Sequence, residues 1–290
     1  MTTRTATLNL LGAGRVGRTL GALWSRKQVF QVQDLLTSSA ESAQAACVAV
    51  GAGRAAASVA DMRPAAVWML AVQDAQIATV AAQLAEAAKS SAFADGRPSA
   101  SPQPLVFHCS GALGASVLQP LADLGWRTAS AHCILSFASL ESALAQFAGT
   151  ACALEGEVSA CAELHTAFTA IGAQCFGVAA QDKVLYHAAA VFATNFMPVL
   201  QSVAEAAWAR SGVPPALLPQ LRASLLRNAV DNINRLGPAG ALTGPAARGD
   251  LAAIARQAAV VEAWDGPSGE AYRALSALAL RLAGRGETPQ

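Results

Sequence analysis

The stretch ATLNLLGAGRVG, residues 6–17, decides how this sequence is interpreted. Its first half is apolar and predicts a buried β-strand. Its second half has the spacing G-x-G-x-x-G, which is typical of a turn that binds a dinucleotide between a strand and a helix. The glycines permit a tight turn, a close approach to the pyrophosphate and packing of the helix on the strand, and free N–H groups at the helix start face the phosphates. We therefore predict a nucleotide-binding turn formed by Gly12, Ala13, Gly14, Arg15, Val16 and Gly17.

The rest of the first 180 residues alternates between short apolar runs and helical patterns. This alternation predicts a Rossmann-type α/β fold, a doubly wound and mostly parallel sheet covered by helices on both faces. A polar loop rich in proline, glycine and serine is expected over 92–104. The expected strands are 6–11, 30–36, 65–72, 105–109, 128–133, 151–154 and 174–178, and the expected helices are 16–27, 41–50, 76–89, 116–124 and 159–171.

The pattern changes near residue 180, after which no further strand is expected. Helices are expected over 181–210, 215–236, 251–264 and 268–285, separated by Pro-Pro and Gly-Pro pairs. We therefore predict two domains without a long linker: a Rossmann dinucleotide-binding domain over 1–180 and an all-α C-terminal domain over 181–290.

The composition excludes several classes of protein. The chain of 290 residues has 20 basic and 19 acidic side chains, so it lacks the basic excess of a nucleic-acid-binding protein. No uncharged apolar stretch reaches about 18 residues, which argues against a membrane span, and the first apolar run is too short for a signal sequence. The six cysteines are scattered without disulfide or zinc spacing, so we expect a reduced, cytoplasmic protein with no metal site.

The identity of the cofactor depends on the end of the second strand, about 20 residues after the turn, where the adenosine ribose binds. Thr37, Ser38 and Ser39 occupy this place, in which an NAD enzyme carries Asp or Glu. Small hydroxyls can bind a 2′-phosphate and no carboxylate repels it, so NADP is favoured over NAD. If the strand ends earlier, Asp34 is the ribose ligand instead. Arg15 either adds positive charge near the phosphates or is a solvated residue at the helix start.

Polar residues follow three further strands, at the edge where ligands of open α/β sheets bind. Val72 and Gln73 follow one strand and Ser110 follows the next, so these residues are expected to flank the nicotinamide half of the cofactor. His132, at the end of a third strand, is a candidate for substrate binding. Like His108, it is also open to a structural interpretation, which is the more common one for an isolated histidine.

The helix that opens the second half carries a polar stripe on an otherwise apolar surface. Lys183 and His187 are four residues apart and share a face; Thr194 lies on nearly the same stripe, and Asn195 flanks it. Reduction of a carbonyl needs a proton or a positive charge at the developing alkoxide, which lysine or histidine can supply. Lys183, His187 and Asn195 are therefore catalytic candidates. The alternative is a solvent-facing helix start.

A second polar island lies between the later helices. Thr243 begins a rigid Thr-Gly-Pro turn, and Arg248 can bind a substrate carboxylate through two parallel hydrogen bonds. Both are candidates for substrate binding; for Arg248 the alternative is a role at an interface. Asp250 is expected to cap the helix that starts at Leu251.

At these motifs the chain resembles a group of Rossmann-like proteins taken to be NADP oxidoreductases, with a C-terminal helical domain of unknown function. They are distant relatives of ketopantoate reductase, pyrroline-5-carboxylate reductase, deazaflavin-dependent NADP reductases and β-hydroxyacid dehydrogenases. The resemblance implies a helical domain that dimerises and an oxidoreductase activity with no settled substrate. Lys183 matches a lysine that acts at the substrate of β-hydroxyacid dehydrogenases, but His187 replaces their asparagine one turn later. The motifs are residues 12–17, 108–114 (HCSGALG), 131–137 (AHCILSF), 183–190 (KVLYHAAA) and 241–250 (ALTGPAARGD).

These observations together predict a cytoplasmic, homodimeric NAD(P)-dependent oxidoreductase that prefers NADP. It would transfer hydride between nicotinamide and a small carbonyl or imine in a cleft between the domains. Two alternatives remain open: a nucleotide-binding sensor or scaffold without turnover, and an NADP reductase linked to a deazaflavin.

Overall fold

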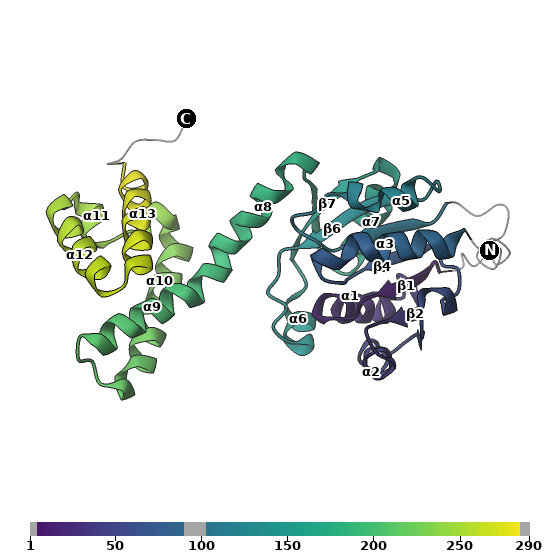
Figure 1. Cartoon of the computed structure of the whole chain (residues 1–290), viewed down its shortest axis with the longest axis horizontal. Coiled ribbons are helices and arrows are strands. Elements are labelled where there is room, and N and C mark those ends of the chain that lie inside the picture. Colours follow the sequence, from purple (N-terminus) through teal and green to yellow (C-terminus); the bar gives the residue numbers. More distant parts are fainter. Residues whose placement is uncertain (1–4, 90–102, 285–290) are drawn as a thin grey trace. The chain divides into compact units, whose positions relative to one another are not determined.

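The computed structural model describes residues 5–89 and 103–284, and it divides into two compact units, Met1–Val191 and Phe192–Gln290 (Figure 1). Each unit is described by itself. Most of the polar loop expected over 92–104 lies outside the described residues. The sequence predicts a domain boundary near residue 180, but the first unit extends to Val191. It includes the helix that begins at Lys183, whose side chain is buried. Within the described ranges no helix has the length and apolar character needed to cross a membrane.

The first unit is built on one eight-stranded sheet with the order β3-β2-β1-β4-β5-β6-β7-β8. Neighbouring strands are parallel except for β6 and β7, so the expected mostly parallel sheet is confirmed. The strands are β1 (Thr7–Leu11), β2 (Gln31–Leu36), β3 (Arg54–Ala55), β4 (Val67–Leu70), β5 (Leu105–His108), β6 (Arg127–Cys133), β7 (Ala151–Gly156) and β8 (Gln174–Gly177).

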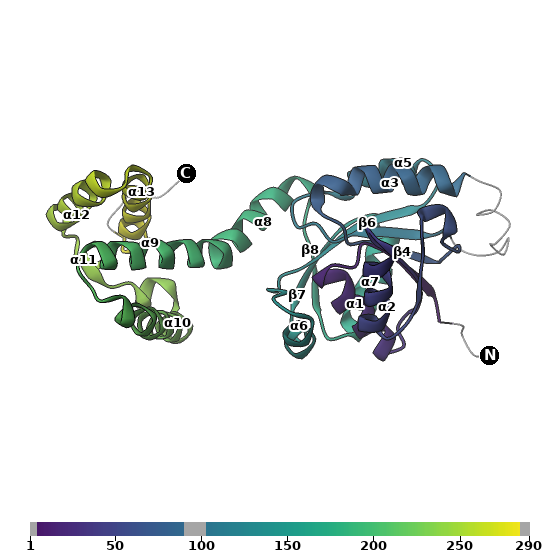
Figure 2. The ribbon, with the colours of Figure 1, turned by 60° about the horizontal axis from the view of Figure 1, so that its bottom comes forward.

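Helices cover both faces of this sheet (Figure 2). One face packs against α1 (Arg15–Arg26), α2 (Ala40–Val50) and α7 (Val158–Ala170), and the other against α3 (Asp74–Ala88) and α5 (Gln119–Ala122). Successive strand side chains alternate between these two cores: Leu10 joins the first and Leu11 the second. The remaining elements among the described residues of this unit are α6 (Leu140–Gln146), α8 (Lys183–Ala190) and three short 3₁₀ turns, Val59–Asp61, Ala115–Leu118 and Ala180–Asp182.

A buried carboxylate braces the strand that leads to the expected ribose site. Asp34 in β2 is fully buried and accepts hydrogen bonds from the guanidinium groups of Arg54 (Nε to Oδ1, 3.0 Å) and Arg63 (Nη2 to Oδ1, 2.6 Å) and from the Arg63 backbone N–H (2.7 Å). Burial acts to raise the pKa of Asp34, but these bonds outweigh it and hold the pKa at about 2. The Asp34 carboxylate is therefore occupied within the protein, which excludes it as the ribose ligand in this arrangement.

The second unit contains only helices among its described residues. A π-helical segment, Val191–Asn195, interrupts the single helix expected over 181–210 and is followed by α9 (Phe196–Arg210). The long helix α10 (Leu218–Ala241) is kinked at Gly237, where φ is 70°, one residue after the expected helix end. A 3₁₀ turn at Pro215–Leu217, α11 (Gly244–Arg248), α12 (Leu251–Trp264) and α13 (Gly266–Leu282) complete it.

Replacing Asp34 by Asn tests its structural role. The substitution keeps the size of the side chain but removes the charge that two guanidinium groups share, so we expect a loss of about 2–3 kcal/mol in the free energy of unfolding. Urea denaturation measures it. Asp61→Asn is the control, because Asp61 also pairs with Arg54 but lies exposed, and its loss of stability should be much smaller since water screens the pair. Equal losses in both variants would contradict the role given to Asp34.

Candidate functional site

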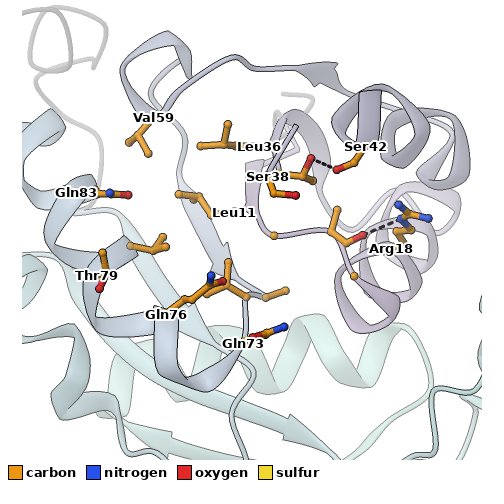
Figure 3. Close-up of a pocket in the computed structure, with 17 residues that line it drawn as sticks. Leu11, Arg18, Leu36, Ser38, Ser42, Val59, Gln73, Gln76, Thr79 and Gln83 are labelled. Carbon is orange, nitrogen blue, oxygen red and sulfur yellow. Dashed lines mark hydrogen bonds between the residues drawn. The ribbon is translucent and has the colours of Figure 1, made fainter. Parts of the chain in front are cut away.

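A cavity of about 770 Å³ opens at the carboxyl ends of β1, β2 and β4 (Figure 3). The glycine turn lines it with Gly12, Ala13 and Gly14, and the segment after β4 lines it with Val72 and Gln73. The end of β2 contributes Thr37 and Ser38, and α2 contributes Ser42. Most of the residues predicted to bind the cofactor therefore surround one cavity.

Two of the three glycines in the turn are tightly packed and the third is open, which is the arrangement that the motif requires. Gly12 has φ of +85°, and a Cβ there would lie 2.6 Å from the Ala71 carbonyl oxygen. A Cβ on Gly17 would lie 2.7 Å from the carbonyl oxygen of Gly12, so only glycine lets α1 approach the turn. Gly14 has nothing within 4 Å of its Cβ position and is exposed. The backbone at Gly14 is thus open to a ligand while its two neighbours in the motif are fixed by packing.

The hydroxyl groups after β2 are not equivalent. Thr37 shares a hydrogen bond with Ser42 and faces the cavity, and Ser38 lines it as well. Ser39 instead caps α2, where its hydroxyl accepts from the backbone N–H of Ser42 (3.1 Å), and it does not line the cavity. Of the three residues expected at the ribose, Thr37 and Ser38 therefore line the cavity and Ser39 does not.

One arginine that the sequence did not single out lines the same cavity. Arg18 in α1 is half-buried, and its Nε donates to the carbonyl oxygen of Ala13 (2.7 Å), which leaves the outer guanidinium nitrogens for other partners. Figure 3 shows Arg18 and Ser42 at one end of the cavity and Gln83 and Thr79 at the other. Arg15, the candidate named from the motif, is exposed and does not line the cavity.

A second cavity of about 360 Å³ lies beside the first, since the consecutive residues Gln73 and Asp74 line one cavity each. Its polar side chains come from four segments: the start of α3, the loop after β5, the end of β6 and helix α8. Val16 of the glycine turn also lies in its wall. The lining residues are Val16, Asp74, Cys109, Ser110, Gly111, His132, Cys133, Leu135, Phe137 and His187.

Ser110 is held by a saturated set of hydrogen bonds. Its hydroxyl donates to Oδ2 of Asp74 (2.6 Å) and accepts from the backbone N–H groups of Ala112 (3.2 Å) and Leu113 (3.0 Å). The Ser110 N–H donates to Nδ1 of His108 (3.2 Å), so the His108 proton lies on Nε2 and is donated to the carbonyl oxygen of Gly114 (3.1 Å). His108 is fully buried, and burial lowers its pKa, so it acts as a neutral support for this loop.

Lys183 is buried behind this loop and does not line the second cavity. Its side chain is 1% exposed, and Nζ donates to the carbonyl oxygen of Ser110 (3.2 Å) and to the hydroxyl of Ser130 (2.9 Å). The Ser130 hydroxyl in turn donates to Glu155, which also accepts from the backbone N–H of Ala115, both at 2.8 Å. Burial lowers the pKa of Lys183, against the attraction of Glu155 and Asp74. Lys183 is a catalytic candidate from the sequence, and that role stays a prediction; in the structure its ammonium group contacts the loop that carries Ser110.

Two histidine rings meet over Gly111 in the second cavity. His132 and His187 pack edge to face with ring centroids 5.5 Å apart, and Nδ1 of His132 lies 2.9 Å from the hydroxyl of Tyr186. Burial, with His187 and Lys183 nearby, lowers the pKa of His132 to about 4, so this ring is neutral at pH 7. The Nδ1 atom of His187 is buried without a hydrogen-bond partner among the described residues. His132 and His187 are the expected site residues that the structure brings together.

The other expected residues belong to the second unit. Asn195 ends the π-helical segment and is exposed, Thr243 precedes α11, and Arg248 ends it with an exposed side chain. Their roles stay predictions from the sequence. The carboxylate of Asp250 accepts from the N–H of Ala253 (2.9 Å), which confirms the expected cap of α12. Over the described ranges no group of three or more His, Cys, Asp or Glu residues can hold a metal ion.

Comparisons with known proteins agree with this architecture. Residues 2–132 match the model of a Rossmann-like domain, and residues 150–279 match a domain of unknown function, DUF2520. The chain thus joins a Rossmann-like domain to a C-terminal DUF2520 domain. A comparison with curated proteins finds no match.

Solved structures share the fold over nearly the whole chain. A protein from Thermotoga maritima is 24% identical, with a TM-score of 0.72 over 96% of this chain and 98% of its own. Pyrroline carboxylate reductase of Plasmodium falciparum with NADP bound is 11% identical (TM-score 0.57, 96% and 98% covered). An imine reductase variant of Myxococcus stipitatus in complex with NAD⁺ is 17% identical (TM-score 0.60, 98% and 96% covered). At these identities the likeness shows a common fold.

Gly111→Ala tests whether the two histidine rings depend on the space at Gly111. The new Cβ would lie 2.4 Å from Nδ1 of His187 and 3.0 Å from the His132 ring, so at least one ring must move. We expect shifted ring resonances of His132 and His187 in NMR spectra and unchanged ones for the other two histidines, with a loss of stability of about 1–3 kcal/mol. Gly177→Ala, with nothing within 4 Å of the Cβ position, is the control. Unmoved His132 and His187 signals in Gly111→Ala would show that the packing is looser than described.

Proposed function

We propose that this protein is an NADP-preferring oxidoreductase that transfers hydride between nicotinamide and a small carbonyl or imine. The observation that carries the proposal is the pair of adjoining cavities at the glycine turn. Gly14 leaves the backbone at the start of α1 open to a pyrophosphate, and the turn contributes residues to both cavities. The adenosine half of the cofactor would occupy the larger cavity, and the nicotinamide and substrate would occupy the smaller one. The fold is one that holds NADP or NAD⁺ in the P. falciparum and M. stipitatus proteins.

The preference for NADP is proposed from the charges at the ribose end of the larger cavity. Thr37, Ser38 and Ser42 offer hydroxyl groups, Arg18 offers a guanidinium, and none of the described residues that line this cavity is a carboxylate. The 2′-phosphate of NADP would find hydrogen-bond donors and a positive charge there. The free 2′-hydroxyl of NAD would find no carboxylate among the described lining residues to accept its hydrogen bond.

In the smaller cavity, His187 is the residue proposed to exchange a proton with the substrate. It lines the cavity, and its buried Nδ1 faces the Cα of Gly111, where an N–H group would find no acceptor. The geometry therefore favours a ring hydrogen on Nε2, the nitrogen that can face the cavity. Lys183 would act indirectly, by fixing the Ser110 loop against which the nicotinamide ring would lie.

Thermal unfolding with NADP, NADPH, NAD and NADH tests the proposal. Native-state binding raises stability by about 2.7 kcal/mol at a ligand concentration 100 times Kd, so the melting temperature should rise most with NADP or NADPH. Arg18→Gln should weaken NADP binding by about 10- to 100-fold and NAD binding much less, since a charge-assisted bond contributes about 1.5–3 kcal/mol. Arg15→Gln, an exposed arginine of the same helix turn, is the matched control.

The outcomes separate the parts of the proposal. No shift with any of the four nucleotides would refute nucleotide binding altogether. An equal loss of NADP and NAD binding in Arg18→Gln would place that arginine at the pyrophosphate and remove it from the argument for NADP. Loss of NADPH absorbance with a panel of small carbonyls and imines would then measure hydride transfer directly.

We also propose that the helical unit associates with a second copy of this chain. Its described residues include only two buried hydrophobic side chains, Ala246 and Ala258, which is too few for a stable core of this size. Large apolar side chains on its helices are instead exposed, in particular on α9 and α10: Phe196, Met197, Val199, Leu200, Leu225, Val230, Ile233 and Leu236. Exposure of this many large apolar side chains is typical of an obligate interface between copies.

Light scattering after gel filtration measures this association. Wild type is expected at twice the chain mass of 29.5 kDa. The double variant Ile233→Glu, Leu236→Glu puts two charges on the exposed face of α10 and should give monomers or aggregates, because buried unpaired charge opposes association. Val48→Glu, at a more exposed apolar position on α2 of the first unit, should remain dimeric. Monomeric, fully folded wild type would refute the proposal.

A further inference from the structure

The polar groups of the smaller cavity are mostly hydrogen-bond acceptors. Asp74 is the one carboxylate among the described lining residues, and no lysine or arginine accompanies it there. Its Oδ2 accepts from Ser110, whereas its Oδ1 has no hydrogen-bond partner within the described part of the chain. The side chain is exposed and thus available to a ligand that enters the cavity.

We propose that this cavity takes a substrate whose reacting group is a nitrogen cation, an iminium in the direction of reduction and the corresponding amine in the direction of oxidation. This rests on the proposed function, because the cavity is a substrate site only if nicotinamide lies beside it. The Asp74 carboxylate would pair with the cation, and substrates with a carboxylate at this point would be repelled.

The alternative, a carbonyl whose oxygen becomes an alkoxide, would find one side-chain donor among the described residues of this cavity, the Nε2–H of His187, and no second donor at Ser110. A developing alkoxide needs donors aimed at it. The only hydroxyl proton of Ser110 already goes to Asp74, and its oxygen already accepts two backbone N–H groups. Lys183, the nearest ammonium group to this loop, is buried behind it and donates to Ser110 and Ser130 instead of to the cavity.

His132 adds a second acceptor. Its Nδ1 and the Tyr186 hydroxyl are 2.9 Å apart, and the Tyr186 hydroxyl is 3.5 Å from the His132 carbonyl oxygen. Both bonds form together when the Nδ1–H donates to the hydroxyl and the hydroxyl donates to the carbonyl. Nε2 of His132 then has a lone pair. Because the ring pKa is about 4, Nε2 stays unprotonated near pH 7 and can accept from an N–H of the substrate.

The chemistry balances without a further reactant. Hydride from NADPH adds to the carbon of the C=N⁺ bond, the π electrons of that bond become the nitrogen lone pair, and the products are a neutral amine and NADP⁺. The amine then takes up a proton from His187, the residue proposed to exchange it, and His187 regains a proton from solvent. The reverse step removes hydride from the carbon next to an unprotonated amine. No proton donor is needed at the instant of hydride transfer, which fits the lack of a free donor at Ser110.

Binding of three five-membered ring compounds to the protein saturated with NADP⁺ tests the inference: pyrrolidinium, cyclopentanol and cyclopentanecarboxylate. Wild type should bind pyrrolidinium most tightly and the carboxylate least. Asp74→Asn keeps an acceptor for Ser110 but removes the charge, so it should weaken pyrrolidinium binding by about 10- to 100-fold and leave cyclopentanol unchanged. Higher ionic strength should reduce the difference between the affinities of wild type for pyrrolidinium and for cyclopentanecarboxylate, because Asp74 is exposed and salt screens its charge.

Glu141→Gln is the matched control, since Glu141 is also an exposed carboxylate in the first turn of a helix, α6, but does not line the cavity. It should leave all three affinities unchanged. Tighter binding of the carboxylate than of pyrrolidinium, or equal pyrrolidinium binding by wild type and Asp74→Asn, would overturn the inference. If NADP⁺ itself fails to stabilise the protein, the proposed function fails first; normal NADP⁺ binding without the charge preference refutes only the substrate class.

Discussion

The buried ammonium of Lys183 holds together three segments that are far apart in the sequence. It joins the start of α8 to the loop after β5 through the Ser110 carbonyl and to the middle of β6 through the Ser130 hydroxyl. A buried charge without partners is strongly unfavourable, so the helix must stay docked on the sheet for these bonds to persist. Glu155 completes the charge balance through Ser130. The shape of the smaller cavity follows from this connection, because two of its walls, the Ser110 loop and α8, are joined by it.

The strands were predictable because most are buried on both faces. Each therefore appears in the sequence as a short apolar run, and the alternation of such runs with helices determines a parallel sheet. The two-residue strand β3 and the short helices α6 and α11 were not predicted, because segments this short contain too few residues to display a periodic pattern. The π-helical segment was missed for a different reason. Its sequence, VFATN, is compatible with an ordinary helix, and only the backbone geometry distinguishes it.

The backbone turn of the site could be predicted from the sequence, whereas the positions of its side chains could be predicted only in part. Gly12, Gly14 and Gly17 are recognisable because their roles depend on having no side chain, which the sequence records directly. Arg15 and Arg18 are three residues apart on one helix, and the packing of α1 beside α2 decides which of them lines the cavity. Lys183 and His187 do share a helix face, as their spacing indicates. One helical turn is nevertheless enough to place the first behind the Ser110 loop and the second in the cavity.

The position of β1 in the sheet affects how the molecule is made. β1 lies between β2 and β4, and Gly12 after it packs against the carbonyl of Ala71, which follows β4. The contact between the turn and Ala71 can therefore form only after β4 has left the ribosome and paired with β1. During synthesis the N-terminal motif emerges first, but it becomes able to bind phosphate only after this long-range pairing, which slows such topologies relative to local hairpins.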